Sequence, residues 1–479
     1  MEDEARPTCS SSRAPLGATA LRHAAFALTL LASAPVLAQS PAPVAATDTA
    51  PPAPAPVAPT AAPTPAPAAA PAPAAAPAAA PASPWTFTPT AQVRLRGESR
   101  LNGYSPVVRP DEYFIASRVR VGLNVTWNRL RVFAQAQDVR NLGDTLPGND
   151  GGSAFGVHQG FAEVGFDHGY IRIGRQEVSY GSERFLGALD WLMNARSFDG
   201  ARVHFNLVPK VEFDAFGAIM RGESTYLVAM APNTTVGDYF VASQLAYVHS
   251  PALRLEGNYF FRHDGPTAAL PTRLTNIHAP TIRLSGNVRE GLIEYDVEGT
   301  VQFGDNNHTE HFAYGAAPDV FVRLGPANRP TLDGGFSLAS GHHANGQVDE
   351  LQNFFPTNHK LYGYMDLFGL RNIVSGHLGV THRFADANVT VGARAWEAFL
   401  QTSNATARWS NAVGTTLGTG QGGSRHLGTE ADFWVSYKPY QFMTLTGGYS
   451  VFAAGNAAEA MGHGDTQHWL WLQLDVTTP

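Results

Sequence analysis

The sequence predicts an all-β fold: a transmembrane antiparallel β-barrel of about eighteen strands, with about sixteen as the alternative count. Three observations lead to this fold class. Segments of roughly ten residues alternate apolar and polar side chains, and the connections between them alternate short and long. No run of about eighteen apolar residues offers a membrane-spanning helix. A soluble β-sandwich or propeller would share the alternation, so the lengths of the connections decide between these folds.

Residues 1–84 differ in composition from the rest of the chain. An apolar run within residues 21–38 follows basic residues and ends in small ones, which is the pattern of a secretion signal. We assign residues 1–38 to a signal peptide, and they contain the only cysteine, Cys9. Residues 39–84 are almost only Ala and Pro and cannot bury enough apolar surface to fold. They are predicted to be a disordered periplasmic linker, and residues 85–479 are predicted to form the barrel.

The period-two alternation is clearest between Ile293 and Phe303. Apolar side chains share one face of this segment, and acidic side chains take the other, at Glu294, Asp296 and Glu298. A register slip of one residue would exchange the two faces, so each such segment is expected to be a strand with one apolar and one polar side. The assignments are weakest between Phe312 and Ser340, and the alternative count of sixteen strands rests on that region.

The connections between these segments alternate in length. Six tight ones lie at Trp127–Leu130, Phe166–Gly169, Asn206–Lys210, His249–Ala252, Val288–Gly291 and Tyr437–Gln441. Much longer Gly- and Asn-rich stretches separate them, at Asn141–Gly156, Arg221–Gly237, His263–His278 and Gln401–Leu427. Short turns at one end and long loops at the other are typical of barrels in the outer membrane of Gram-negative bacteria. Aromatic residues near the short turns fit an interfacial girdle, at Trp127, Phe166, Tyr247, Tyr437 and Tyr440.

Arginine dominates the polar faces, with 30 Arg against 3 Lys in the chain. A guanidinium facing lipid would cost about 2–4 kcal/mol at the midplane, so these side chains are expected to line the lumen. Their planar fork suits carboxylates and phosphates. The candidate pore-lining and substrate-contacting residues are Arg94, Arg96, Arg118, Arg120, Arg131, Asp138, Arg140, Arg172, Arg202, Arg254, Arg283, Arg394, Glu294, Asp296 and Glu298. Two interpretations stay open: a field of paired charges that selects by size only, or a basic stripe along which a polyanion slides.

Three sequence motifs resemble a known family. The runs RIGRQEVSYG at residues 172–181, RSFDG at 196–200 and FAQAQDVR at 133–140 are similar to those of the alginate-export family of outer-membrane porins. The resemblance extends over residues 85–479. It implies an eighteen-stranded barrel whose electropositive constriction passes a linear, carboxylate-bearing polysaccharide outward. The matching constriction positions are Arg94, Arg96, Arg118, Arg120, Asp138, Arg140, Arg172 and Arg202. The Ala/Pro-rich segment departs from the family pattern, and so does the C-terminus, which lacks a terminal aromatic residue.

The leading interpretation is a passive channel that exports an anionic, alginate-like polysaccharide through the outer membrane. A general porin, or one that takes up small anions and carboxylates, is the alternative, and a structural or adhesive barrel would conduct little. Long loops such as residues 341–370 are expected to fold over or into the pore as gates. The expected partners are outer-membrane lipid, the polysaccharide or small anions, and a periplasmic scaffold held by the linker, with the chain acting as a monomer.

Other kinds of chemistry lack a recognisable site. The chain carries a net charge of −7 and no basic tract, which argues against nucleic-acid binding. No serine lies in a nucleophile turn, so no enzyme activity and no cofactor are expected. Two histidine pairs are expected to be solvated loop residues rather than metal ligands. They are His308 with His311, and His342 with His343.

Overall fold

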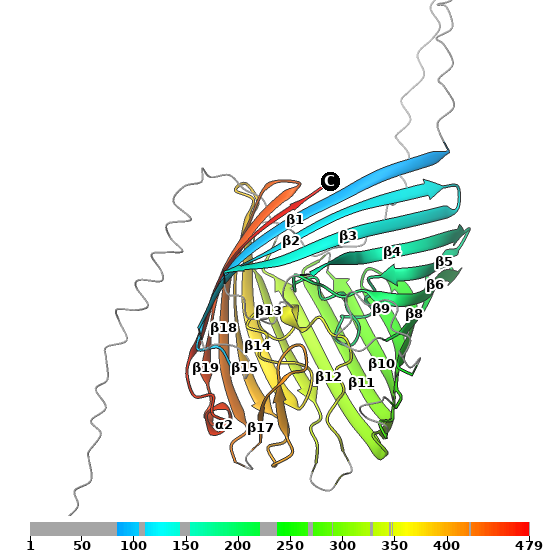
Figure 1. Ribbon diagram of the computed structural model, residues 1–479. Helices are drawn as coiled ribbons and strands as arrows, with labels where there is room; N and C mark the ends of the chain where they lie inside the picture. Colours follow the sequence, from blue (N-terminus) through cyan, green and yellow to red (C-terminus); the bar gives the residue numbers. More distant parts are fainter. Residues whose placement is uncertain are drawn as a thin grey trace, which may run out of the picture.

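Eighteen strands form one closed antiparallel sheet in the computed structural model (Figure 1). The structure describes residues 84–104, 111–143, 154–220, 237–266, 272–289, 291–325, 329–343, 346, 348–420 and 423–478. The predicted signal peptide and the predicted linker up to residue 83 lie outside these residues, so both assignments stay predictions.

The barrel strands are β1 (Trp85–Leu101), β2 (Glu112–Trp127), β3 (Leu130–Gly143), β4 (Ala154–Phe166), β5 (Gly169–Gln176), β6 (Phe198–Val208), β7 (Val211–Ile219), β8 (Tyr239–Ser250), β9 (Leu253–Asp264), β10 (Thr275–Val288), β11 (Ile293–Asn306), β12 (Thr309–Arg323), β13 (Thr331–Ala339), β14 (Ile373–Phe384), β15 (Val389–Leu400), β18 (His426–Tyr440), β19 (Met443–Ala454) and β20 (Gln467–Thr477). A small separate sheet pairs β16 (Arg408–Ser410) with β17 (Thr416–Thr419), and two short helices, η1 (Asn358–Lys360) and α2 (Asn456–Ala460), lie in loops. None of the helices in the described residues has the length and apolar character needed to cross a membrane.

The sheet closes because β1 pairs with both β2 and β20. Full closure leaves no strand edge unpaired, which is the condition for a sheet to lie in lipid. The predicted count of eighteen is therefore confirmed. The region where the sequence was ambiguous forms β12 and β13, which pair through seven residue pairs that begin at Gly315 and Ala339.

The strands expose their apolar residues and bury their charges. On β2, Val119 and Val121 are 39% and 60% exposed. Arg120 lies between them in the sequence and is 6% exposed, and Arg118 precedes them and is 0% exposed. Opposing residues of paired strands share a face, so this alternation continues around the barrel. An apolar outer face and a polar inner face fit a wall that stands in lipid and encloses a polar lumen.

The short turns lie at the end that carries the C-terminus, and the long loops lie at the end that carries α2 and β17 (Figure 1). Exposed aromatic side chains stand at the short-turn end. Trp85 stacks on Trp127 with ring centroids 5.4 Å apart, and Tyr440 stacks on Phe442 at 5.3 Å. Because this end faces the periplasm in barrels of this kind, these rings occupy the level expected for the inner lipid–water interface.

Two loops from the long-loop end, the 177–197 loop and the 341–372 loop, fold into the barrel. They meet in a parallel bridge between Leu186 and Phe355. Both loops contribute side chains to a buried apolar cluster, Phe185 from the first loop and Tyr362 from the second. Residues of the inner wall complete this cluster. The expectation that residues 341–370 enter the barrel is met by this arrangement, and the core of the molecule lies inside the barrel.

Candidate functional site

Four arginines, hereafter the arginine cluster, stand side by side on the inner face of β1 and β2. Arg94 and Arg96 come from β1, and Arg118 and Arg120 come from β2. The register places Arg94 directly opposite Arg118. Like charges that face each other across two strands destabilise a sheet, so this arrangement requires a counter-charge.

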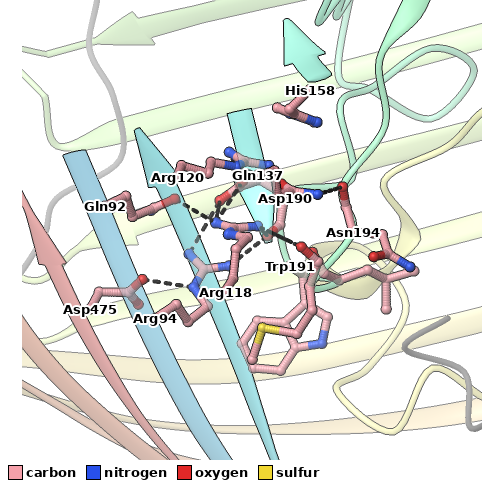
Figure 2. Close-up of polar contacts among 12 residues, drawn as sticks. Gln92, Arg94, Arg118, Arg120, Gln137, His158, Asp190, Trp191, Asn194 and Asp475 are labelled. Carbon is pink, nitrogen blue, oxygen red and sulfur yellow. Dashed lines mark hydrogen bonds and ion pairs between the residues drawn. The ribbon is translucent and has the colours of Figure 1, made fainter. Parts of the chain in front are cut away.

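The carboxylate of Asp190 in the 177–197 loop supplies that counter-charge (Figure 2). Its oxygens lie 3.2 Å from Arg94 Nη2, 3.0 Å from Arg118 Nη2 and 3.1 Å from Arg120 Nη1. A second acid, Asp475 of β20, lies 2.7 Å from Arg94 Nε. Three guanidinium groups therefore converge on one loop carboxylate.

The same arginines also hold the backbone of the loop. Arg118 Nη1 lies within hydrogen-bonding distance of three carbonyl oxygens of the loop, at 3.1 Å from Asp190 O, 3.3 Å from Leu192 O and 3.4 Å from Met193 O. Arg96 donates to the carbonyl of Trp191 at 2.9 Å, and its guanidinium lies 4.3 Å from the centre of the Trp191 ring. The β1–β2 wall thus fixes the position of the loop inside the barrel.

The environment of Asp190 keeps its carboxylate charged. Burial raises the pKa of Asp190, but the guanidinium groups of Arg118, Arg94 and Arg120 outweigh this effect and lower the pKa to about 2. The side chain of Asp190 is nevertheless 48% exposed, while that of Arg118 is fully buried. A negatively charged solute in the lumen can therefore approach Asp190 and its partners from one side.

Two donors of the arginine cluster lack an acceptor. Nε of Arg118 and Nη2 of Arg120 are buried and make no hydrogen bond within the described residues. A buried donor without a partner costs free energy, about 1–3 kcal/mol and more for a charged group. Part of the hydrogen-bonding capacity of Arg118 and Arg120 is therefore unused among the described residues.

The other predicted arginines of the inner wall do not join this site. They are spread around the barrel as ion pairs: Arg172 with Glu163, Arg202 with Asp214, Arg254 with Glu212 and Glu256, Arg283 with Glu256 and Asp296, and Arg394 with Asp333. Arg131 lies 3.8 Å from Glu163 and stays 37% exposed. Glu298 is buried beside Arg184 of the 177–197 loop, and Glu294 is exposed near the short turns. Most of the wall is a field of paired charges.

Asp138 and Arg140 form an ion pair at 2.7 Å, but they do not face the lumen. The register pairs Asp138 with Val119, whose side chain is on the outer face, while the neighbouring Gln137 pairs with Arg120 on the inner face. The expectation that Asp138 and Arg140 line the pore is therefore wrong. Both are partly exposed on the outer surface, towards the long-loop end of β3.

Asp190 and the aromatic stack beside it were not among the residues predicted to contact the solute. The ring of Trp191 lies 3.9 Å from that of His359 in the 341–372 loop, and His359 lies 5.0 Å from Tyr364, with all three rings nearly parallel. The stack joins the two inserted loops. The position of Asp190 and Trp191 in the sequence could have indicated them, because both lie between the motifs RIGRQEVSYG and RSFDG.

One of the four histidines expected to be solvated loop residues is placed differently. His311 lies in β12 and is 1% exposed, so this expectation is wrong for His311. Asp349 bridges His311 and His342, with distances of 3.2 Å and 2.9 Å to their Nδ1 atoms. A cavity of about 240 Å³ adjoins this bridge. Within the described part of the chain, no group of three or more His, Cys, Asp or Glu side chains has the arrangement of a metal site.

The closed eighteen-stranded sheet, its apolar outer face and its charged inner wall define a β-barrel channel of the Gram-negative outer membrane. Within that class, the chain matches the family described as "Alginate export" over residues 88–471, and it belongs to this family. No curated protein matches the chain.

Solved structures of Pseudomonas aeruginosa channels share the fold. OpdL is 13% identical, with a TM-score of 0.57 and coverage of 82% of this chain and 98% of that chain. OpdK, solved with vanillate, is 12% identical, with a TM-score of 0.56 and coverage of 81% and 98%. OccK8 (OprE) is 11% identical, with a TM-score of 0.58 and coverage of 82% and 98%. At these identities the similarity establishes the fold alone.

Proposed function

We propose that this channel exports a carboxylate-bearing, alginate-like polysaccharide and that the arginine cluster is its main contact site. The observation that carries the proposal is the convergence of Arg94, Arg118 and Arg120 on the half-exposed carboxylate of Asp190. Three guanidinium forks around one carboxylate form a site built for carboxylates. Membership of the alginate export family supports both the substrate class and the direction.

Asp190 acts in this proposal as a tethered competitor. Its carboxylate occupies the place that a uronate carboxylate of the solute would take, and a passing chain would exchange with it. Such exchange keeps each contact weak, because every step forward breaks one ion pair and makes another. A conduit needs this balance, since a solute that binds too tightly does not leave.

The test is the block of single channels in planar bilayers by oligo-uronates. Asp190→Asn removes the competitor and one negative charge, so we expect tighter block by the oligomers and a shift of the reversal potential towards anions. Arg120→Gln should weaken the block. Asp167→Asn is the matched control, because Asp167 pairs with the exposed Arg129 at a short turn, away from the site. An unchanged or weaker block in Asp190→Asn would contradict the proposed role.

A second candidate is the uptake of small carboxylates. The 177–197 and 341–372 loops fill part of the barrel and leave less room for a polymer, and this favours uptake of small solutes. The likeness in fold to OpdK, which was solved with vanillate, points the same way. Liposome swelling separates the candidates: rapid entry of monomeric carboxylates without block by oligomers would favour uptake, and oligomer block would favour export.

A further inference from the structure

Four neighbouring short turns carry a row of basic side chains, here called the basic arc. The turns join β10–β11, β12–β13, β14–β15 and β18–β19, and these strands are consecutive in the sheet (Figure 1). The residues of the basic arc are Arg289, Arg323, Arg329, Arg383 and Lys438. This end of the barrel faces the periplasm.

The basic side chains of the arc are accessible, and they outnumber the acidic side chains of the same turns. Its four arginines are exposed, and none of its five residues forms an ion pair with another described residue. In the sequence, the acids of these turns and of the strand residues next to them are Glu290, Glu294 and Asp386, against five basic side chains. By contrast, Arg129 on the β2–β3 turn is paired with Asp167 on the β4–β5 turn.

The register directs part of the basic arc towards the lumen. Arg323 shares a face of β12 with Asp319, which lies 2.6 Å from Arg184 inside the barrel. Arg383 shares a face of β14 with His377, which lies 3.6 Å from the inner-wall Asp333. Side chains on this face stand at the mouth of the channel, whereas phospholipid headgroups would meet the outer face.

Because of the spacing between its turns, the basic arc should bind polymers and small anions differently. Adjacent turns are two strands apart, which is at least about 10 Å along the rim. A small carboxylate can reach one turn only. A polymer with a charge on each unit can contact several turns at once, and such multivalent contact raises its local concentration at the mouth.

We propose that the basic arc is a capture site for a polyanion that enters the channel from the periplasmic side. The proposal rests on the proposed function, because it assigns the entry point for the same carboxylate-bearing chain. Capture is electrostatic and multivalent, so it increases the rate of entry and depends on ionic strength. The arginine cluster then receives a chain that is already held at the mouth.

The experiment compares block by uronate monomers and by long oligomers, added to one side of single channels at low salt. One-sided thiol labelling of Asp465→Cys, in an exposed long loop, assigns the orientation of each channel. We expect the double variant Arg323→Glu/Arg383→Glu to lower the on-rate of long oligomers from the periplasmic side by roughly tenfold. Monomers, and oligomers from the opposite side, should be unaffected. Lys210→Glu, a reversal at the β6–β7 turn outside the arc, should leave the on-rate unchanged.

The outcomes separate this proposal from the proposed function. If the unmodified channel is not blocked by oligomers from either side, the proposed function fails. If it is blocked, and Asp190→Asn tightens the block while the double variant has the normal on-rate, the capture site alone is overturned. An equal loss of on-rate in Lys210→Glu also overturns it. Native mass spectrometry tests whether the arc binds lipid headgroups instead. If the double variant has the normal on-rate but binds less phosphatidylglycerol than the unmodified channel, the arc is a lipid-headgroup site.

Discussion

Replacing Arg118 by Met should loosen the attachment of the 177–197 loop to the barrel wall. Arg118 is fully buried, pairs with Asp190 at 3.0 Å and lies close to three loop carbonyls. Breaking a buried ion pair typically costs about 3–5 kcal/mol. Because the side chain of Asp190 is 48% exposed, water replaces part of the lost interaction, and we take about 2 kcal/mol as the loss of loop attachment.

The reporter for this loss is Met193→Cys. Met193 is fully buried between the loop and the wall, against Ala116 and Val139, so a thiol at this position reacts only when the loop leaves the wall. The native chain has one cysteine, Cys9, which lies in the predicted signal peptide. A loss of about 2 kcal/mol corresponds to labelling that is about 30-fold faster.

The matched control is Arg172→Met in the same reporter background. Arg172 is also an inner-wall arginine, but its partners lie in strands: it pairs with Glu163 of β4 at 2.5 Å, and its guanidinium lies over the rings of Phe161 and Tyr170. Its labelling rate should equal that of the reporter alone. Equal labelling rates in Arg118→Met and the control would show that Arg118 does not hold the loop and that the arginine cluster does not fix its position.

Two further predictions concern pH and backbone strain. Because the pKa of Asp190 is lowered from 3.8 to about 2, its ion pairs should hold the loop fully above about pH 4 and be lost as the pH falls through about 2. The difference in ion selectivity between the unmodified channel and Asp190→Asn should therefore stay constant down to about pH 4 and disappear as the pH falls through about 2. A midpoint near pH 4 for this difference would disprove the arginine effect. Gly174 has φ of +130°, and a Cβ there would lie 2.3 Å from the carbonyl of Gly160, so Gly174→Ala should lower the free energy of unfolding by about 1–3 kcal/mol in urea titrations. Gly156→Ala, where a Cβ meets nothing within 4 Å, is the control, and equal stabilities of the two variants would contradict the strain.

The barrel could be predicted from the sequence because its signals are local. A strand in lipid alternates apolar and polar residues every second position, and a short turn needs only a few particular residues. All six tight connections named from the sequence lie at hairpins, as at Trp127 opposite Leu130 and Phe166 opposite Gly169. Three of these hairpins, β6–β7, β8–β9 and β18–β19, have a register irregularity next to the turn.

The error at Asp138 and Arg140 has a physical cause. The inner face of β3 is polar at Gln137 but apolar at Val139, because Met193 of the inserted loop packs there. Inner-wall residues that a loop covers can be apolar, as in a protein core, whereas inner-wall residues that face a water-filled lumen are polar. The alternation therefore inverts at this point, and nothing in β3 itself reports the loop that causes it.

The role of Asp190 could not be predicted for a related reason. Its partners Arg94 and Arg118 lie 96 and 72 residues away in the sequence, and they meet it only when the loop enters the barrel. A single acid in a long loop has no periodicity to mark it. The arginines were identified because they interrupt apolar strands, whereas their counter-charge had no such signature.

The arginine cluster therefore has two tasks that limit each other, and its members differ in how they divide them. Arg118 is fully buried and touches the loop backbone, whereas Arg120 contacts the loop through the carboxylates of Asp190 and Glu177, at 3.1 Å and 3.5 Å. Nη2 of Arg120 is buried and makes no hydrogen bond within the described residues. Attachment should thus depend mainly on Arg118, and carboxylate selectivity mainly on Arg120. Labelling of Met193→Cys and block by oligo-uronates should then respond to different arginines, and a cluster that acted only as a structural clamp would change both measurements together.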